Sequence, residues 1–177
     1  MEARNFITAR EMLNDGNWIL TTMDGVARYE KPPLPSWITA ISASIFGLDN
    51  IIALRIPSAL ITIALLFFSY GFMQKITKDN QQALIATLIL STSFMLVFAG
   101  RNNTWDIYAH TFIIGGIYFL YKTLSQASNY WRNYLLAGLL LGLSFMSKGP
   151  VAHYVLLLPF LIAFGITFGF KNRLKWK

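Results

Sequence analysis

The sequence predicts an all-α integral membrane protein, with about five transmembrane helices and additional interfacial juxtamembrane helices. Two observations lead to this fold class. Hydrophobic residues make up 55% of the 177 positions and charged residues only 13%, and the mean hydropathy is +0.48. Several apolar runs are also long enough to cross a bilayer. The chain contains no cysteine, so neither a disulfide framework nor a thiolate metal site is expected.

Residues 1–34 are predicted to form an extracytoplasmic loop that includes a juxtamembrane helix. Within residues 4–14, apolar side chains recur at helical spacing on one side, which predicts a short amphipathic helix. That predicted apolar face consists of Phe6, Ile7, Ala9, Met12 and Leu13. Two extended pieces are predicted next, at 18–23 and 26–29, because the turn signal Asp24-Gly25 separates them.

The stretch from Arg28 to Leu34 joins this loop to the membrane part and places an acid and a base before two prolines. The prolines restrict φ and remove two backbone donors, so Glu30 and Lys31 project from a stiff, extended segment. Two interpretations stay open. In the first, the Lys31 ammonium holds an anionic head group while the Glu30 carboxylate binds a metal or a polar substrate. In the second, both charges are simply solvated at an interfacial turn.

Residues 35–177 are predicted to form the transmembrane helical region. The first helix, 35–46, covers only about 18 Å against a hydrocarbon core of roughly 30 Å, so it is expected to lie in the interface. The segment 133–147 is also short, but the aromatic residues and Arg132 that precede its core can extend it through the interface. The predicted spans are 51–74, 81–99, 106–121, 133–147 and 151–170.

The loops between these spans alternate in charge, which predicts an orientation. One side is strongly basic and is therefore expected to be cytoplasmic. Its basic residues are Lys75, Lys78, Lys122, Arg132, Lys171, Arg173, Lys175 and Lys177. The net charge of +7 then reflects a membrane rim next to anionic lipids, and no nucleic-acid partner is needed to explain it.

The opposite, extracytoplasmic side collects the ionisable residues that are candidates for chemistry, which are Glu2, Glu30, Lys31, Arg55, Arg101, Asp106 and Lys148. Asp106 opens a helix, and either it has a chemical role or it is a carboxylate stabilised by the helix dipole. Arg55 either extends to the surface or holds a lipid phosphate. His110 shares a helix face with Asp106, and two interpretations stay open for it. In the first, His110 and Asp106 form a metal pair or a proton relay, and in the second, His110 is a packing residue. The same two interpretations, ligand or packing residue, stay open for His153.

The order and spacing of several motifs resemble those of the GT-C glycosyltransferases of family 39. This family includes protein O-mannosyltransferases and the bacterial lipid A aminoarabinose transferases. The motifs are Glu2-Ala3-Arg4, Ala9-Arg10-Glu11-Met12-Leu13, Gly16-Asn17-Trp18, Tyr29-Glu30-Lys31-Pro32-Pro33-Leu34, Arg55-Ile56-Pro57-Ser58-Ala59-Leu60, Thr104-Trp105-Asp106 and Ser147-Lys148-Gly149-Pro150. The likeness extends over nearly the whole chain.

The resemblance implies a partial GT-C fold and a sugar transfer from a polyprenyl-phosphate carrier to a lipid A-like or protein acceptor. The reaction would take place on the extracytoplasmic face of a bacterial inner membrane. The implied catalytic residues are Glu2 and Asp106, and the only implied cofactor is a divalent metal ion at Glu30. The implied substrate-binding residues are Lys31, Arg55 and Lys148.

The sequence departs from the family pattern near its start. Met1 stands where the family carries an Asp next to Glu2, and the first spanning helix is absent. The chain is therefore expected to be a fragment of a longer transferase. The alternative is a non-catalytic membrane protein that binds lipid phosphates. A small transporter fits less well, because the charges gather at one surface and not at mid-membrane.

Overall fold

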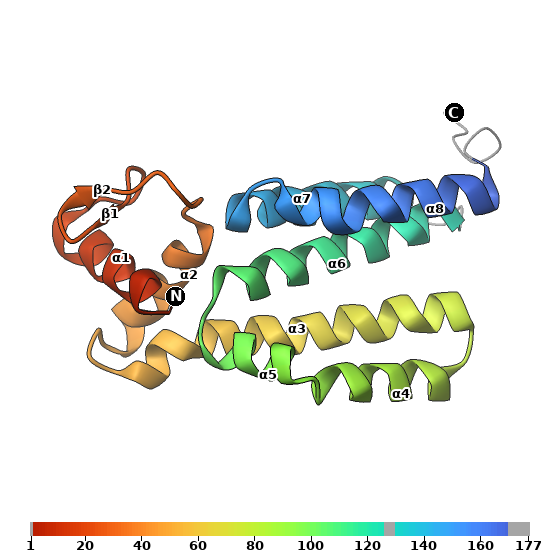
Figure 1. Ribbon diagram of the computed structural model, residues 1–177, viewed down its shortest axis with the longest axis horizontal. Coiled ribbons are helices and arrows are strands. Elements are labelled where there is room, and N and C mark those ends of the chain that lie inside the picture. Colours follow the sequence, from red (N-terminus) through yellow and green to blue (C-terminus); the bar gives the residue numbers. More distant parts are fainter. Residues whose placement is uncertain (1, 126–129, 170–177) are drawn as a thin grey trace.

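The computed structural model describes residues 2–125 and 130–169, which form a helical bundle with a small cap at one end (Figure 1). The predicted basic tail at 171–177 and the end of the predicted span 151–170 lie outside these residues. The described elements are α1 (Glu2–Asp15), β1 (Thr22–Met23), β2 (Val26–Ala27), α2 (Leu34–Phe46), α3 (Ile51–Thr77), α4 (Asn80–Ser91), α5 (Phe94–Arg101), α6 (Trp105–Ser125), α7 (Tyr130–Lys148), the π-helix η1 (His153–Leu157) and α8 (Leu158–Phe168).

The cap consists of α1, the two short strands and α2. The predicted turn does join two antiparallel strands, with Thr22 opposite Ala27 and Met23 opposite Val26, but each strand has only two residues and is shorter than the predicted pieces 18–23 and 26–29. Both turn residues have positive φ, 55° at Asp24 and 74° at Gly25, as a two-residue hairpin turn requires. Helix α2 begins directly after the two prolines and ends at Phe46, and Gly47, whose φ is 97°, caps it.

The predicted amphipathic helix is confirmed as α1, but the predicted buried face is only partly correct. Ala9 and Met12 are buried as expected, whereas Phe6 and Ile7 are only half-buried. The polar residues Asn5 and Thr8 are buried in addition. Helix α1 packs against α2 through hydrogen bonds as well as apolar contacts, and hydrophobic periodicity does not detect a polar contact face.

Helix α6 packs between α3 and α7 at the centre of the bundle (Figure 1). Two glycines allow this close approach. A Cβ at Gly115 would lie 2.8 Å from the Phe68 ring, and one at Gly116 would lie 2.7 Å from the Leu141 side chain. By contrast, a Cβ at Gly138 or Gly142 would meet no atom of the described residues within 4 Å.

The single helix predicted over 81–99 is wrong. Helices α4 and α5 meet at an angle of 62° across the break at residues 92–93. The local sequence Ser91-Thr92-Ser93 explains the break, because the Thr92 hydroxyl donates to the carbonyls of Leu88 and Ile89. Such side-chain bonds compete with continued helical pairing of the backbone.

The predicted segment 151–170 is also not one regular helix, because η1 precedes α8. The N–H of Leu158 bonds to the carbonyl of His153 in the wide π pattern. Pro159 has no N–H with which to continue the α pattern at the next position, and this absence explains the wider turn.

Helix α3 alone, among the described elements, has both the length and the hydropathy of a membrane span, and α4 with α5 would add one bent span. The total number of spans therefore stays a prediction. The long elements run side by side in alternating directions (Figure 1). This places the start of α3, the end of α5, the start of α6 and the end of α7 at the cap end of the bundle.

Candidate functional site

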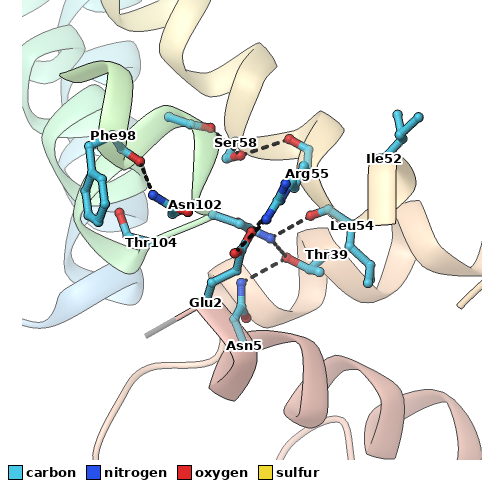
Figure 2. Close-up of polar contacts among 12 residues, drawn as sticks. Glu2, Asn5, Thr39, Ile52, Leu54, Arg55, Ser58, Phe98, Asn102 and Thr104 are labelled. Atoms are coloured by element: carbon cyan, nitrogen blue, oxygen red, sulfur yellow. Dashed lines mark hydrogen bonds and ion pairs between the residues drawn. The ribbon is translucent and has the colours of Figure 1, made fainter. Parts of the chain in front are cut away.

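The first feature of the cap end is an ion pair between α1 and α3. Arg55 Nε lies 2.7 Å from Glu2 Oε1, and Arg55 Nη2 lies 3.0 Å from Glu2 Oε2 (Figure 2). Two parallel bonds of this kind fix the orientation of a carboxylate as well as its position. The structure therefore joins a predicted catalytic acid to a predicted phosphate-binding residue. The Glu2 side chain stays 19% exposed, so it is accessible from the surface.

A second ion pair lies at the start of α6. The Lys148 ammonium, at the last residue of α7, donates to Asp106 Oδ1 in the first turn of α6. Each charge also lies at the helix end that stabilises it, an acid at an N-terminus and a base at a C-terminus. Both side chains are about one-third exposed, at 32% for Asp106 and 28% for Lys148. The predicted clustering of these two residues on one face is thus what the structure shows.

Glu30 and Lys31 occupy the loop between β2 and α2. Glu30 is exposed and Lys31 is half-buried, and neither side chain has a hydrogen bond or ion pair with any residue in the described ranges 2–125 and 130–169. Lys31 lines a small hollow at the junction of cap and bundle, together with Arg28, Ser36 and Trp105. Its ammonium is therefore available to a ligand, as a phosphate-binding role requires.

The fit of a metal ion at Glu30 is poor within the described part of the chain. No group of three His, Cys, Asp or Glu side chains gathers there or elsewhere among these residues. A metal bound by Glu30 would take its other ligands from substrate, water or further residues.

Arg28 is a buried residue of the site that the sequence did not identify. Its guanidinium carbon lies 4.8 Å from the centre of the Trp105 ring, and its Nη1 donates to Thr8 Oγ1 at 3.2 Å. Burial lowers the pKa of the Arg28 guanidinium, while the nearby Glu30 carboxylate acts in the opposite direction. Because Trp105 directly precedes Asp106, this cation–π contact ties the cap to the start of α6. Nothing in the local sequence distinguishes Arg28 from a solvated base.

A buried polar network, also missed by the sequence, lies beneath the Glu2–Arg55 pair (Figure 2). Asn103 donates to Thr39 Oγ1 at 3.0 Å and to the carbonyl of Leu54 at 2.7 Å. Asn5 also donates to Thr39 Oγ1, at 3.1 Å. The Tyr108 hydroxyl donates to Asn103 Oδ1 at 2.7 Å. The network therefore connects α1, α2, α3 and α6 beneath the surface charges.

An apolar groove of about 560 Å³ begins beside Asp106 and runs along α6. The bend between α4 and α5 contributes one wall, and η1 contributes to the other side. Its lining is mainly aliphatic, with Leu65, Leu90, Leu96, Ile107, Ile114 and Leu156. The groove thus combines a charged mouth with a long apolar interior.

The two histidines are placed differently. His110 is exposed and lines the groove, and the described residues show no hydrogen bond between it and Asp106. His153 Nε2 lies 3.2 Å from the carbonyl of Leu141, which supports the packing interpretation for this residue. The metal-pair and proton-relay interpretation of His110 stays untested.

These features place charged side chains beside an apolar groove at one end of a helical bundle. The chain belongs to the dolichyl-phosphate-mannose-protein mannosyltransferase family, whose sequence pattern matches residues 30–177. The resemblance found in the motifs is confirmed by this match. The chain is accordingly an all-α integral membrane protein.

Curated relatives carry a more specific description. The undecaprenyl phosphate-α-4-amino-4-deoxy-L-arabinose arabinosyl transferase of Edwardsiella ictaluri is 28% identical over 167 residues, which cover 92% of this chain. The protein of the same name from Wigglesworthia glossinidia brevipalpis is 29% identical over 165 residues, again 92% of this chain. The chain spans only about 30% of the length of these relatives.

Two solved structures share the fold. The crystal structure of ArnT from Cupriavidus metallidurans in the apo state superposes on this chain with a TM-score of 0.80 at 21% identity. The superposed region covers 98% of this chain and 33% of the ArnT chain. The structure of the same protein bound to undecaprenyl phosphate gives a TM-score of 0.79 at 21% identity, with the same coverage. The chain therefore has the fold of about one third of that protein.

Proposed function

We propose that the intact protein is a membrane glycosyltransferase that transfers a sugar from a polyprenyl-phosphate carrier to a lipid or protein acceptor. The active face would be extracytoplasmic, in a bacterial inner membrane. The observation that carries this proposal is the apolar groove that opens at Asp106, at the same end of the bundle as Lys31 and the two ion pairs. The names of the curated relatives support the carrier class and point to a pentose as the sugar.

In this function the groove takes the apolar tail of the carrier. Its volume of about 560 Å³ and its aliphatic lining suit several prenyl units. The head of the carrier then lies at the cap end. The Lys31 ammonium holds the carrier phosphate, because a phosphate that departs with negative charge needs a nearby cation.

The two carboxylates act on the acceptor. Glu2 and Asp106 would accept or orient the proton of the attacking group, and a positioned acid or base of this kind gives rate factors of about 10² to 10⁴. Arg55 orients Glu2 through the two-pronged pair, and Lys148 orients Asp106. Sugar transfer then breaks the bond between the sugar and the carrier phosphate, forms the bond to the acceptor, and leaves polyprenyl phosphate as product.

The alternative function is binding of lipid phosphates without catalysis. One observation favours it, since both candidate catalytic carboxylates are already engaged by a base in the structure. A binding protein needs only Lys31 and the groove, whereas a transferase needs Glu2 or Asp106 to act on an acceptor.

The test uses the intact protein in lipid nanodiscs, with undecaprenyl phosphate for binding and its labelled sugar derivative for turnover. Lys31→Ala should weaken binding at least tenfold, and Lys31→Arg should restore part of it. Lys75→Ala, at the far end of α3, is the matched control and should bind as the unmodified protein does. Equal binding by Lys31→Ala would reject the role of Lys31.

Turnover separates the two functions. Sugar transfer that Asp106→Asn abolishes supports the transferase, whereas tight binding with no transfer by the unmodified protein supports the binding protein. Absence of both activities would refute both functions.

A further inference from the structure

Asn103 lies in the short turn between α5 and α6 and is fully buried. Its φ is 43°, in the left-handed region, which asparagine adopts more readily than most residues do. The backbone at this position therefore turns sharply, and the side chain points into the junction between cap and bundle instead of to the surface. A buried polar side chain in such a turn requires partners.

Each hydrogen-bonding group of the Asn103 and Thr39 side chains has a partner. The Asn103 amide donates both hydrogens, one to Thr39 Oγ1 and one to the carbonyl of Leu54, and its oxygen accepts from Tyr108. Thr39 Oγ1 accepts from Asn5 and Asn103 and donates to the carbonyl of Pro35, which is the full capacity of a hydroxyl. Removal of either side chain would leave buried donors without a partner.

Each contact of this network lies next to a residue of the candidate site. Asn5 lies one helical turn after Glu2 on α1, and Leu54 directly precedes Arg55 on α3. Tyr108 lies two positions after Asp106 on α6. The network thus fixes three helix ends relative to one another, and these ends carry the two candidate catalytic carboxylates and the base that orients one of them.

We propose that Asn103 and Thr39 are positioning residues, which hold α1 and α6 so that Glu2 and Asp106 face the same substrate. This inference rests on the proposed transferase function. Neither residue is placed in contact with substrate. Both act through the geometry of the helices, and a misplacement of about 1 Å at a reacting group can cost about 10²-fold in rate.

The activity test uses substitutions that change the network but little else. Thr39→Val preserves shape and removes the hydroxyl, and Asn103→Gly tolerates the positive φ but removes the amide. In the intact protein, each should lower kcat per folded molecule about 10²-fold, with the KM for the carrier changed less than about twofold. Thr39→Ser keeps the hydroxyl and should restore most of the rate.

Thr123→Val is the matched control. Thr123 is also buried, but its hydroxyl donates to the carbonyl of Phe119 in its own helix. If Thr39 has only the ordinary structural role of a buried threonine, Thr39→Val will lower the yield of folded protein and leave kcat per folded molecule unchanged. That result would overturn the proposal.

A distance measurement tests the same inference without activity. Residues 1–177 contain no cysteine, so once any cysteine elsewhere in the intact protein has been replaced, spin labels can be attached at two introduced cysteines, Arg10→Cys on α1 and Val151→Cys after α7. We expect a narrow distance distribution in the otherwise unmodified protein, in Thr39→Ser and in Thr123→Val, and a broad or shifted one in Thr39→Val and Asn103→Gly. An unchanged distribution in these last two variants would overturn the proposal. If the unmodified protein transfers no sugar, the proposed function fails, and the distances alone decide the positioning.

Discussion

Arg55 and Glu2, which are 53 positions apart in the sequence, form a two-pronged ion pair that attaches α1 to the start of α3. The pair uses the Nε–H and one Nη2–H of the guanidinium, so both N–H groups of Nη1 and the second of Nη2 are left for another ligand. Arg55 can therefore donate to a substrate phosphate through these remaining groups while it orients Glu2. The planar guanidinium is essential to this arrangement, because an ammonium cannot form the parallel pair of bonds.

Substitution of Arg55 tests this geometry. Arg55→Lys keeps the charge but loses the two-pronged contact, and we expect sugar transfer by the intact protein to fall about 10²-fold because Glu2 is no longer oriented. The measurement is kcat with the labelled carrier sugar. The exchanged double variant Glu2→Arg/Arg55→Glu should restore attachment of α1, seen as recovered protection of α1 from hydrogen exchange, without restoring transfer. Normal transfer by Arg55→Lys would contradict the role.

Lys148 is expected to act through Asp106. Lys148→Met removes the ammonium that donates to Asp106 Oδ1, and transfer should fall about tenfold or more, since Asp106 loses its fixed orientation. Lys122→Met is the control, because Lys122 lies in the last turn of the same helix that Asp106 opens. Steady-state kinetics of the two variants provide the comparison, and an equal effect of both would show that only net charge matters.

The groove predicts a dependence on the length of the carrier tail. Met95 lines the groove and is largely exposed, so Met95→Trp should fill part of it without disturbing the core. We expect about tenfold weaker binding of undecaprenyl phosphate and unchanged binding of a carrier with two prenyl units. Ile89→Trp, an exposed position on α4 that is not among the groove residues, should affect neither ligand. Equal loss for long and short tails would place the tail elsewhere.

Glycine substitutions should separate close helix packing from intrinsic helix propensity. A Cβ at Gly116 would lie 2.7 Å from Leu141 Cδ2 and 2.8 Å from its Cγ, so Gly116→Ala must displace α7 or the leucine and should cost about 1–3 kcal/mol. Gly142→Ala meets nothing within 4 Å and should gain about 0.5–1 kcal/mol in helix stability. Thermal unfolding in detergent measures both, and a lower Tm for Gly142→Ala would show that unobserved neighbours occupy that face.

The elements that could be predicted from the sequence are those whose signal is local. The hairpin at Asp24-Gly25, the helix that begins after Pro32 and Pro33, and the long apolar helices each follow from turn chemistry or hydrophobic runs. The break at Thr92 was missed because the hydropathy of 81–99 is continuous. Its cause, hydroxyl groups that bond to backbone carbonyls, does not alter hydropathy.

The candidate site was predicted as a set of charged residues at one end of the molecule, and Glu2, Arg55, Asp106 and Lys148 do lie there. Their pairing could not be predicted, because a topology gives the depth of a residue but not its neighbour. Arg28, Thr39 and Asn103 were missed for a related reason. A buried polar residue has no distinct sequence pattern, and it is stabilised by partners that are remote in the chain.

The sequence alone determined the class of protein, the family and the end of the bundle where the charges gather, because composition, motif order and loop charge are properties of the linear chain. Only the tertiary structure decided which acid meets which base, where the groove opens and which buried amide joins the helices. Those contacts span separations of up to 64 positions, as between Thr39 and Asn103. They depend on how α1, α2, α3 and α6 pack, and packing is determined by all of these segments together.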